Sequence, residues 1–294
     1  MDKQQGRQQW FRRKSVLRDS IVGALTIKDG VISRLHTSKR RADNGSDGDL
    51  YLSPHADDVC FSLGSLVNHR RAGILLTIFS QSDHLLQQTS WRTNAFQTMD
   101  ARQKIETASR IRRMEDLAFA DRVGLKAAFA GLDEARLRNR DPFDSAKSVE
   151  DAVWLERQLI DAIAAAGNAP AASRPVLYCP MGIGGHVDHL VTLRIVRKRY
   201  EELHSRYEIA FYEDLHYAAN WENRVSGVSR FRDIIYPLKP RRWMFPVENG
   251  EYKLDLIRIY RSQFRDVPDN IVDFIPATKI FSRPHEAVWT LGDV

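Results

Sequence analysis

The sequence predicts an α/β protein: a Rossmann-like three-layer sandwich with a mostly parallel sheet, plus a short N-terminal β-hairpin extension. From residue 49 onward, short apolar runs alternate with amphipathic segments, which is typical of parallel strands joined by helical crossovers. Histidine and aspartate residues cluster directly after two of these runs, where ligands bind in open α/β sheets. The chain has 294 residues, 43% of them hydrophobic, which is enough for a substantial core.

The first 47 residues are expected to form a basic extension ahead of one domain at 48–294. Apolar and polar residues alternate over 21–36 around Asp29-Gly30, a dipeptide suited to a tight turn, so this stretch predicts a hairpin. The Gln-rich start is expected to be a solvated tail. Its basic residues are Arg7, Arg12, Arg13, Lys14 and Arg18.

Five short apolar runs, each ended by polar or turn residues, are the expected strands of the sheet. They are residues 49–54, 74–80, 126–131, 176–180 and 208–214. Apolar residues that recur at helical spacing predict the helices. These cover residues 59–69, 150–166, 187–204 and 253–264. The polar segment 81–103 has no clear period, so we expect a long loop near the site there, with its helical content left open.

Composition excludes several classes of protein. The net charge of +6 arises from 44 basic and 38 acidic residues, a mixed surface that argues only weakly for nucleic acid. No apolar run approaches the roughly 18 residues needed to cross a bilayer, and the N-terminus lacks the apolar stretch of a secretory signal. Cys60 and Cys179 cannot form a disulfide framework. We therefore expect a cytoplasmic protein without a nucleic-acid partner, and the oligomeric state stays open.

The first polar cluster contains His55, Asp57 and Asp58, between an expected strand and an expected helix. An imidazole and a carboxylate three residues apart on such a turn can converge on one cation, and Zn²⁺ accepts both as ligands. Asp57 would then lie beside the metal, where it could take a proton from a water. The alternative is that an aspartate caps the helix and His55 is an incidental loop residue.

The second cluster contains His186, Asp188 and His189, after a glycine-containing loop at the start of another expected helix. His189 would complete a metal site of two nitrogens and one carboxylate, with an open position typical of hydrolytic sites. His186 could stabilise an oxyanion or protonate a leaving amine, and Asp188 could orient a histidine. A capped helix with surface histidines is again the alternative.

These motifs resemble those of the LmbE/PIG-L de-N-acetylases over about residues 48–265. The sequences HADD and GGHVDH are similar to the family's HPDD and HxDH motifs. Further similar segments occur in the family's order: IRRMEDLAFADRVGL at 111–125, GLD at 131–133, YEDLHYA at 212–218 and KLDLIRIYRSQ at 253–263. Three positions depart from the pattern, because Ala56 and His216 stand where relatives carry proline and Val59 replaces an acidic residue.

The resemblance implies a Rossmann-like fold, Zn²⁺ or another divalent metal, and hydrolysis of an acetamide, commonly on an amino sugar. It implies metal ligation by His55, Asp58 and His189. It also implies a general base at Asp57, and an oxyanion stabiliser or acid at His186. Arg112 and Asp133 would lie near the substrate. Arg112 could instead pair with Glu115 on a helix surface, and Asp133 could be a turn residue.

The predicted function is thus metal-dependent removal of an acetyl group from an N-acetylated amino sugar or a sugar-containing metabolite. One alternative is an amidase that acts on a larger sugar conjugate. The other is a non-catalytic carbohydrate- or nucleic-acid-binding protein. The sequence does not identify the acyl acceptor.

Overall fold

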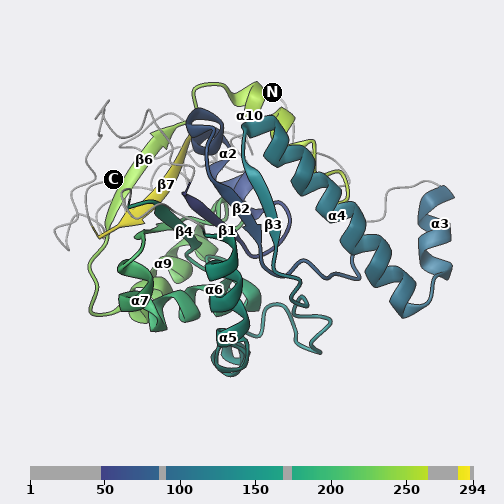
Figure 1. The fold of residues 1–294 in the computed structure, drawn as a ribbon, viewed down its shortest axis with the longest axis horizontal. Helices are drawn as coiled ribbons and strands as arrows, with labels where there is room; N and C mark the ends of the chain where they lie inside the picture. The colour runs from purple at the N-terminus through teal and green to yellow at the C-terminus, as the bar shows by residue number, and fades with distance from the viewer. Residues whose placement is uncertain (1–47, 86–90, 168–173, 264–283, 292–294) are drawn as a thin grey trace, which may run out of the picture.

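The computed structural model describes residues 48–85, 91–167, 174–263 and 284–291. A seven-stranded sheet with the order β3-β2-β1-β4-β5-β7-β6 forms its centre (Figure 1). The strands are β1 (Leu50–Ser53), β2 (Ile74–Thr77), β3 (Lys126–Phe129), β4 (Val176–Pro180), β5 (Glu208–Tyr212), β6 (Arg241–Pro246) and β7 (His285–Thr290). The first five are mutually parallel, whereas β7 is antiparallel to both β5 and β6.

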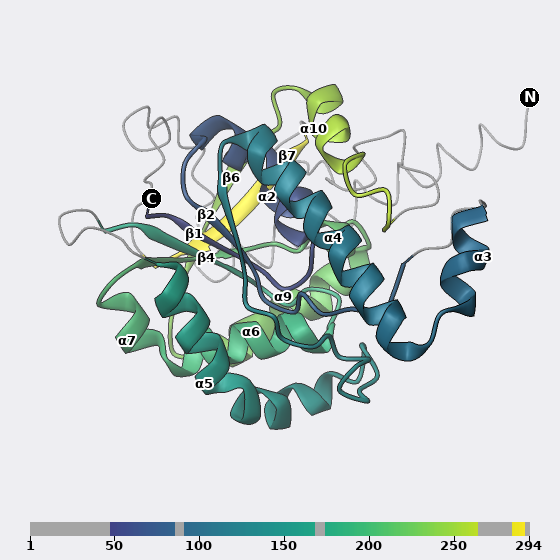
Figure 2. The ribbon, with the colours of Figure 1, turned by 45° about the vertical axis from the view of Figure 1, so that its right-hand side comes forward.

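Helices cover both faces of the sheet, so the predicted three-layer architecture is confirmed. The helices are α2 (Asp58–Arg70), α3 (Trp91–Thr98), α4 (Ala101–Val123), α5 (Ser148–Ala166), α6 (Val187–Lys198), α7 (Tyr200–His204), α8 (Leu215–Ala218), α9 (Trp221–Ile235) and α10 (Gly250–Ile257), with a 3₁₀ turn at Ser145–Lys147. Figures 1 and 2 both show α2, α4 and α10 on one side of the sheet and α5, α6, α7 and α9 on the other.

The strand order reverses between β1 and β4. From β1 the chain moves outward through β2 to the edge strand β3, and then returns across the sheet to place β4 on the other side of β1. Leu50 and Tyr51 of β1 pair in parallel with Leu177 and Tyr178 of β4. In such a sheet, the connections that leave the two strands run in opposite directions, which opens a crevice at their carboxyl ends.

The structure extends the sequence predictions at one place and corrects them at another. All five expected strands are present, but the antiparallel strands β6 and β7 were not predicted. The expected long loop at 81–103 is wrong for much of its length, because α3 and the start of α4 occupy it. A reciprocal capping box between Asp100 and Gln103 starts α4 and gives it a defined boundary. The predicted hairpin at 21–36 lies outside the described residues.

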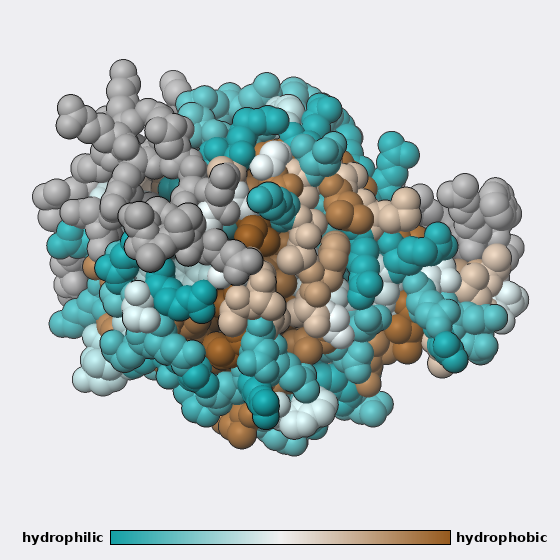
Figure 3. Space-filling model, viewed as in Figure 1, coloured by the Kyte–Doolittle hydropathy of each residue, from teal (hydrophilic) through white to brown (hydrophobic). Residues whose placement is uncertain are grey.

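The core is continuous and lies on both sides of the sheet. Every residue of β1 and β7 is buried, whereas β3 at the sheet edge is partly exposed. Figure 3 shows a mostly hydrophilic face with an apolar patch near its centre. Among the described residues, no helix combines the length and the apolar character needed to cross a membrane.

A fully buried ion pair ties α10 and β7 to α2. Lys253 Nζ lies 2.6 Å from Glu286 Oε1 and donates to the Cys60 carbonyl at 2.7 Å. The Glu286 carboxylate also accepts from the backbone N–H groups of Ser65 and Leu66, both at 2.8 Å. Neither side chain of the pair is exposed to solvent, so removal of one partner leaves the other as an uncompensated buried charge.

We expect Lys253→Met to lower the free energy of unfolding by about 3 kcal/mol, because Glu286 would keep its charge without its cation. Urea denaturation measures this loss. Arg258→Met is the matched control, since Arg258 pairs with Asp255 at the surface and should change stability by less than about 0.5 kcal/mol. Equal stabilities of the two variants would contradict a structural role for the buried pair.

Candidate functional site

The polar clusters found in the sequence meet at the carboxyl ends of β1 and β4. His55 and Asp58 follow β1, and His189 lies in the first turn of α6 after β4. Because the two strands are neighbours at the reversal of strand order, residues more than 130 positions apart come into contact. This is where doubly wound sheets bind their ligands.

Three predicted ligand atoms form a nearly equilateral triangle. Asp58 Oδ2 lies 3.3 Å from His55 Nδ1 and 3.2 Å from His189 Nε2, and the two nitrogens are 3.3 Å apart. Zn²⁺ lies about 2.0 to 2.1 Å from nitrogen and oxygen ligands. A point at that distance from all three atoms would make ligand–cation–ligand angles of about 105°. The triangle therefore fits three corners of a tetrahedral site.

Hydrogen bonds on the far side of each imidazole fix its tautomer. His55 Nε2 lies 2.9 Å from Asp188 Oδ2, and His189 Nδ1 lies 2.6 Å from Asp214 Oδ1. Where a carboxylate accepts at the outer nitrogen, the inner nitrogen presents a lone pair. Two lone pairs and a carboxylate oxygen then face one another at 3.2 to 3.3 Å, an arrangement that a positive charge between them relieves.

The electrostatic environment agrees with this need for positive charge. Burial lowers the pKa of His189, but the charge of Asp58 and the hydrogen bond with Asp214 outweigh it and raise the pKa to about 9. Burial opposes protonation of His55 too, yet hydrogen bonds with Asp188 and Asp58 raise its pKa well above the usual value. Either a proton or a metal ion can supply this positive charge.

Asp188 is the centre of a buried network behind His55. Its Oδ2 also accepts from the backbone N–H of Ala135 at 3.0 Å, and its Oδ1 lies 2.7 Å from Arg138. Arg138 is in turn 2.8 Å from Asp151 in α5. Asp188 thus lies where it can orient His55, which is the role expected for it.

Asp57 has an unusual backbone conformation next to this triangle. Its φ of 110° is one that residues with a side chain rarely adopt, and its side chain makes no capping hydrogen bond to α2. The alternative that Asp57 is a helix-capping side chain is therefore wrong. Burial, together with the neighbouring Asp58 charge, raises the pKa of Asp57 well above the usual carboxyl value.

His186 caps α6 and lies on the open side of the site. Its Nδ1 accepts from the backbone N–H of Asp188 at 3.2 Å, so the proton of the neutral ring is on Nε2. Burial and the neighbouring His55 charge keep the pKa of His186 well below its usual value. The ring centroid is 4.6 Å from that of His55. The site therefore contains a neutral imidazole with an N–H donor beside the ligand triangle.

A further histidine lies close to the cluster. His216 Nε2 is 3.6 Å from Asp58 Oδ1, and Asp58, His189 and His216 together could also hold a metal ion. Burial lowers the pKa of His216 to about 4. Its Nδ1 has no hydrogen-bond partner among the described residues, unlike the outer nitrogens of His55 and His189. Of these two sets, the first triangle is the one in which a carboxylate orients each imidazole.

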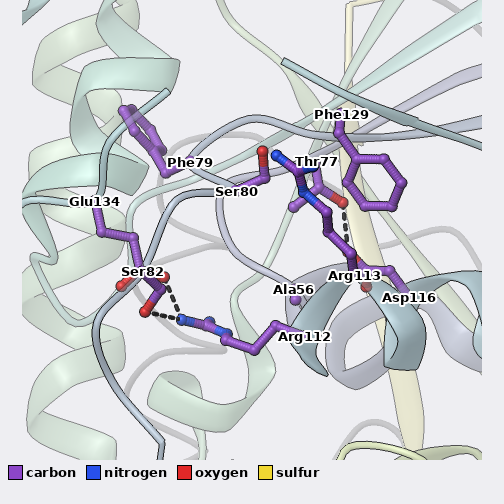
Figure 4. Close-up of a pocket in the computed structure, with 10 residues that line it drawn as sticks. All are labelled: Ala56, Thr77, Phe79, Ser80, Ser82, Arg112, Arg113, Asp116, Phe129 and Glu134. Carbon is purple, nitrogen blue, oxygen red and sulfur yellow. Dashed lines mark hydrogen bonds and ion pairs between the residues drawn. The ribbon is translucent and has the colours of Figure 1, made fainter. Parts of the chain in front are cut away.

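Arg112 and Asp133, both expected near the substrate, are placed differently. Arg112 is buried and forms an ion pair with Glu134, and it donates to Ser82 Oγ at 2.9 Å (Figure 4). The alternative pairing with Glu115 is wrong, because that carboxylate accepts from Ser262. Asp133 is exposed, its backbone forms an isolated bridge with Gln81, and its carbonyl accepts a hydrogen bond from Arg138.

Three residues of the site were not assigned roles from the sequence. Asp214 follows β5 in the YED segment, and its position at a strand end was the available signal. Glu134 and Arg138 lie in an irregular segment after β3, which has no periodic pattern. Their roles depend on tertiary contacts, so the sequence offered no local signal for them.

Comparison with known proteins shows that part of the chain is similar in sequence to a deacetylase. No family model matches the chain. A 2'-N-acetylparomamine deacetylase from Streptomyces fradiae is 31% identical over 173 residues, which are 58% of this chain and 57% of that protein. The chain thus spans a little over half the length of this curated relative.

Solved structures of a deacetylase share the fold. The zinc-inhibited form of teicoplanin deacetylase Orf2 superposes with a TM-score of 0.53 at 18% identity, and covers 82% of this chain and 96% of its own. A complex of a deacetylase with teicoplanin gives a TM-score of 0.51 at 17% identity over the same shares. At these identities the likeness concerns the fold alone.

We expect Arg138→Leu to weaken Zn²⁺ binding about 10- to 100-fold, because Asp188 would lose the cation that holds it against His55. Competition with a chromophoric chelator measures the affinity. Arg136→Leu is the matched control, since the Arg136 side chain is 54% exposed and pairs only with Asp83 at 3.4 Å. If all three proteins bound Zn²⁺ equally, Asp188 would not support a metal ligand.

The buried carboxyl of Asp116, which is not part of the ligand triangle, predicts a pH effect on stability. Asp116 is fully buried and lies 2.5 Å from Thr77 Oγ1 (Figure 4). It also lies 2.9 Å from the Tyr260 hydroxyl, and burial raises its pKa to about 7. Between about pH 4 and pH 7 the folded protein holds this proton and the unfolded chain does not. The contribution of Asp116 to the free energy of unfolding therefore falls over that window as the pH rises.

Asp116→Asn removes this titration while it keeps the shape of the protonated side chain. The stability difference should shift by about 2 kcal/mol in favour of the variant between about pH 5 and pH 8, as measured by urea denaturation at both values. Asp121→Asn, at an exposed position of the same helix, is the control. Parallel stability curves for Asp116→Asn and the wild type would show that Asp116 does not titrate in this range.

Proposed function

We propose that this chain is an N-deacetylase of the LmbE/PIG-L type that uses Zn²⁺ or another divalent metal to remove an acetyl group from an N-acetylated amino sugar. The observation that carries the proposal is the ligand triangle, whose three acceptor atoms lie 3.2 to 3.3 Å apart. Asp57 adjoins Asp58 in the sequence, and the His186 ring centroid lies 4.6 Å from that of His55. The relative that deacetylates 2'-N-acetylparomamine supports the choice of substrate class.

His55, Asp58 and His189 would hold the cation. When bound, it would lower the pKa of a water molecule and polarise the amide carbonyl. Asp188 and Asp214 hold the two imidazoles with their inner lone pairs toward the site. The backbone N–H of His55 also donates to Asp58 Oδ2 at 2.8 Å, which fixes the carboxylate.

Asp57 is the proposed general base. It is buried, it neighbours a ligand in sequence, and its pKa is raised toward the range in which a carboxylate accepts a proton effectively. In this role Asp57 takes a proton from the attacking water. The same carboxyl then returns the proton to the amine nitrogen as the carbon–nitrogen bond breaks, which leaves acetate and a free amine.

His186 is the proposed donor to the oxyanion. The backbone of α6 occupies its Nδ1, so Nε2–H is free to donate a hydrogen bond to the carbonyl oxygen as negative charge develops there. A neutral ring with a lowered pKa suits hydrogen-bond donation better than proton transfer to a leaving amine. Of the two roles expected from the sequence, the tautomer favours the first.

We propose no catalytic role for Arg112 or Asp133. The Arg112 guanidinium is committed to Glu134 and Ser82, and its positive charge favours the ionised form of Asp57. We therefore assign Arg112 to the support of the base, with no direct contact to the substrate. Asp133 could contact only the outer part of a substrate, because its side chain is exposed.

The wild-type protein loaded with Zn²⁺ should release acetate from a panel that includes N-acetylglucosamine and 2'-N-acetylparomamine, and a chelator should abolish the release. Asp57→Asn should bind Zn²⁺ with near wild-type affinity yet lose about 10²- to 10⁴-fold in kcat, because it keeps the ligands and lacks the base. Coupled acetate assays and metal analysis measure the two effects.

The alternatives give different results in the same experiment. Release of a larger acid from a sugar conjugate, with no acetate from the panel, would indicate an amidase. Absence of stoichiometric metal would favour a non-catalytic binding protein. A near wild-type rate for Asp57→Asn would show that another group is the base.

A further inference from the structure

An exposed aromatic side chain stands at the outer edge of the site. Phe143 is 59% exposed, although large apolar side chains are normally buried. Its ring centroid lies 5.5 Å from that of His186, with the ring planes 78° apart. Because His186 in turn contacts His55, the rings of His55, His186 and Phe143 form a path from the ligand triangle to solvent.

Hydrogen bonds hold the backbone around Phe143. The Phe143 N–H donates to Asp141 Oδ1 at 2.9 Å, and its carbonyl accepts from the Ser145 N–H at 2.9 Å. The Pro142 carbonyl accepts from the Val187 N–H at 2.7 Å, which joins this segment to the start of α6. The backbone that carries the exposed ring is therefore fixed relative to the start of α6, as a preorganised binding surface requires.

Tyr217 supplies a second aromatic wall. Its ring centroid lies 6.3 Å from that of Phe143 and 5.7 Å from that of His189. It packs directly on the backbone at Gly184, where φ is +90° and an added Cβ would lie 2.4 Å from the Tyr217 ring. A glycine is thus required at this position for Tyr217 to approach the loop before α6.

We propose that Phe143 and Tyr217 form an aromatic subsite that binds the apolar C–H face of the ring carrying the amide. This inference rests on the proposed function, which puts the amide carbonyl at His186. The substituent on the amide nitrogen then extends outward, and Phe143 is the next side chain along the path from His186 to solvent. Phe143 bears no polar group, so this part of the subsite selects a flat apolar face and not a charge.

Such a subsite contacts the substrate away from the reacting carbonyl. Its interaction with the ring is the same in the ground state and in the transition state, so loss of the interaction raises KM and leaves kcat nearly unchanged. This signature separates a binding residue from one that supports the catalytic groups. It also predicts no effect on an N-acetyl substrate that has no ring.

The test compares N-acetylglucosamine with acyclic N-acetylethanolamine in the full-length, Zn²⁺-loaded protein. Phe143→Ala should raise KM for the sugar about five- to tenfold with kcat within about twofold, and should leave kcat/KM for the acyclic amide near the wild-type value. Phe143→Trp should restore the sugar KM. Trp154→Ala, which removes a 64% exposed aromatic from α5, is the matched control and should change neither substrate.

Binding of glucosamine, measured by calorimetry without turnover, separates the inference from the proposed function. Weaker binding to Phe143→Ala than to the wild type would support the subsite even if no acetate were released, in which case only the proposed function would fail. Acetate release with unchanged KM and binding for Phe143→Ala would overturn the subsite alone. Equal losses of kcat/KM for the sugar and the acyclic amide would also overturn the subsite. A wild-type protein that neither binds nor deacetylates the sugar would overturn both the subsite and the proposed function.

Discussion

The reversal of strand order between β1 and β4 is the constraint on which the site depends. The two strands pair in parallel, but the chain leaves them toward opposite edges of the sheet, so no crossover covers their carboxyl ends. The turn after β1 and the loop after β4 can therefore converge, which brings His55 to within 3.3 Å of His189. Insertion of another strand between β1 and β4 would separate them by about 5 Å more and leave two half-sites.

Around this crevice, the protein concentrates negative charge that its own cations balance only in part. Asp58 contacts both facing histidines, Asp188 contacts His55 and Asp214 contacts His189. Among the described residues, only Asp188 of these three also forms an ion pair with an arginine, Arg138. Hydrogen bonds orient each carboxylate, so the imidazoles cannot turn their lone pairs away from one another. This arrangement thus lowers the stability of the metal-free fold, and binding of a cation would restore that stability.

The sequence predicted the parts of this arrangement that are local. The strand ends, the helix starts and the histidine and aspartate spacing lie within short segments, and the five expected strands are present. The partners of the site residues were not predictable in the same way. Arg138 and Glu134 act across the fold on Asp188 and Arg112, and only tertiary contacts bring them together. The strands β6 and β7 were missed because antiparallel additions to a parallel sheet carry no crossover pattern.

The pairing of Arg112 with Glu134 has a consequence for substrate selection. An unpaired arginine beside Asp57 would attract an anionic group, but Glu134 neutralises Arg112, which is only 7% exposed as a residue. Around His186, the described ring contacts on the outer side come from aromatic carbon, at Phe143, and the inner contacts come from other imidazoles. In the proposed function, the charged groups of this site therefore act on the amide and the metal, while recognition of the rest of the substrate depends on the shape of its apolar surface.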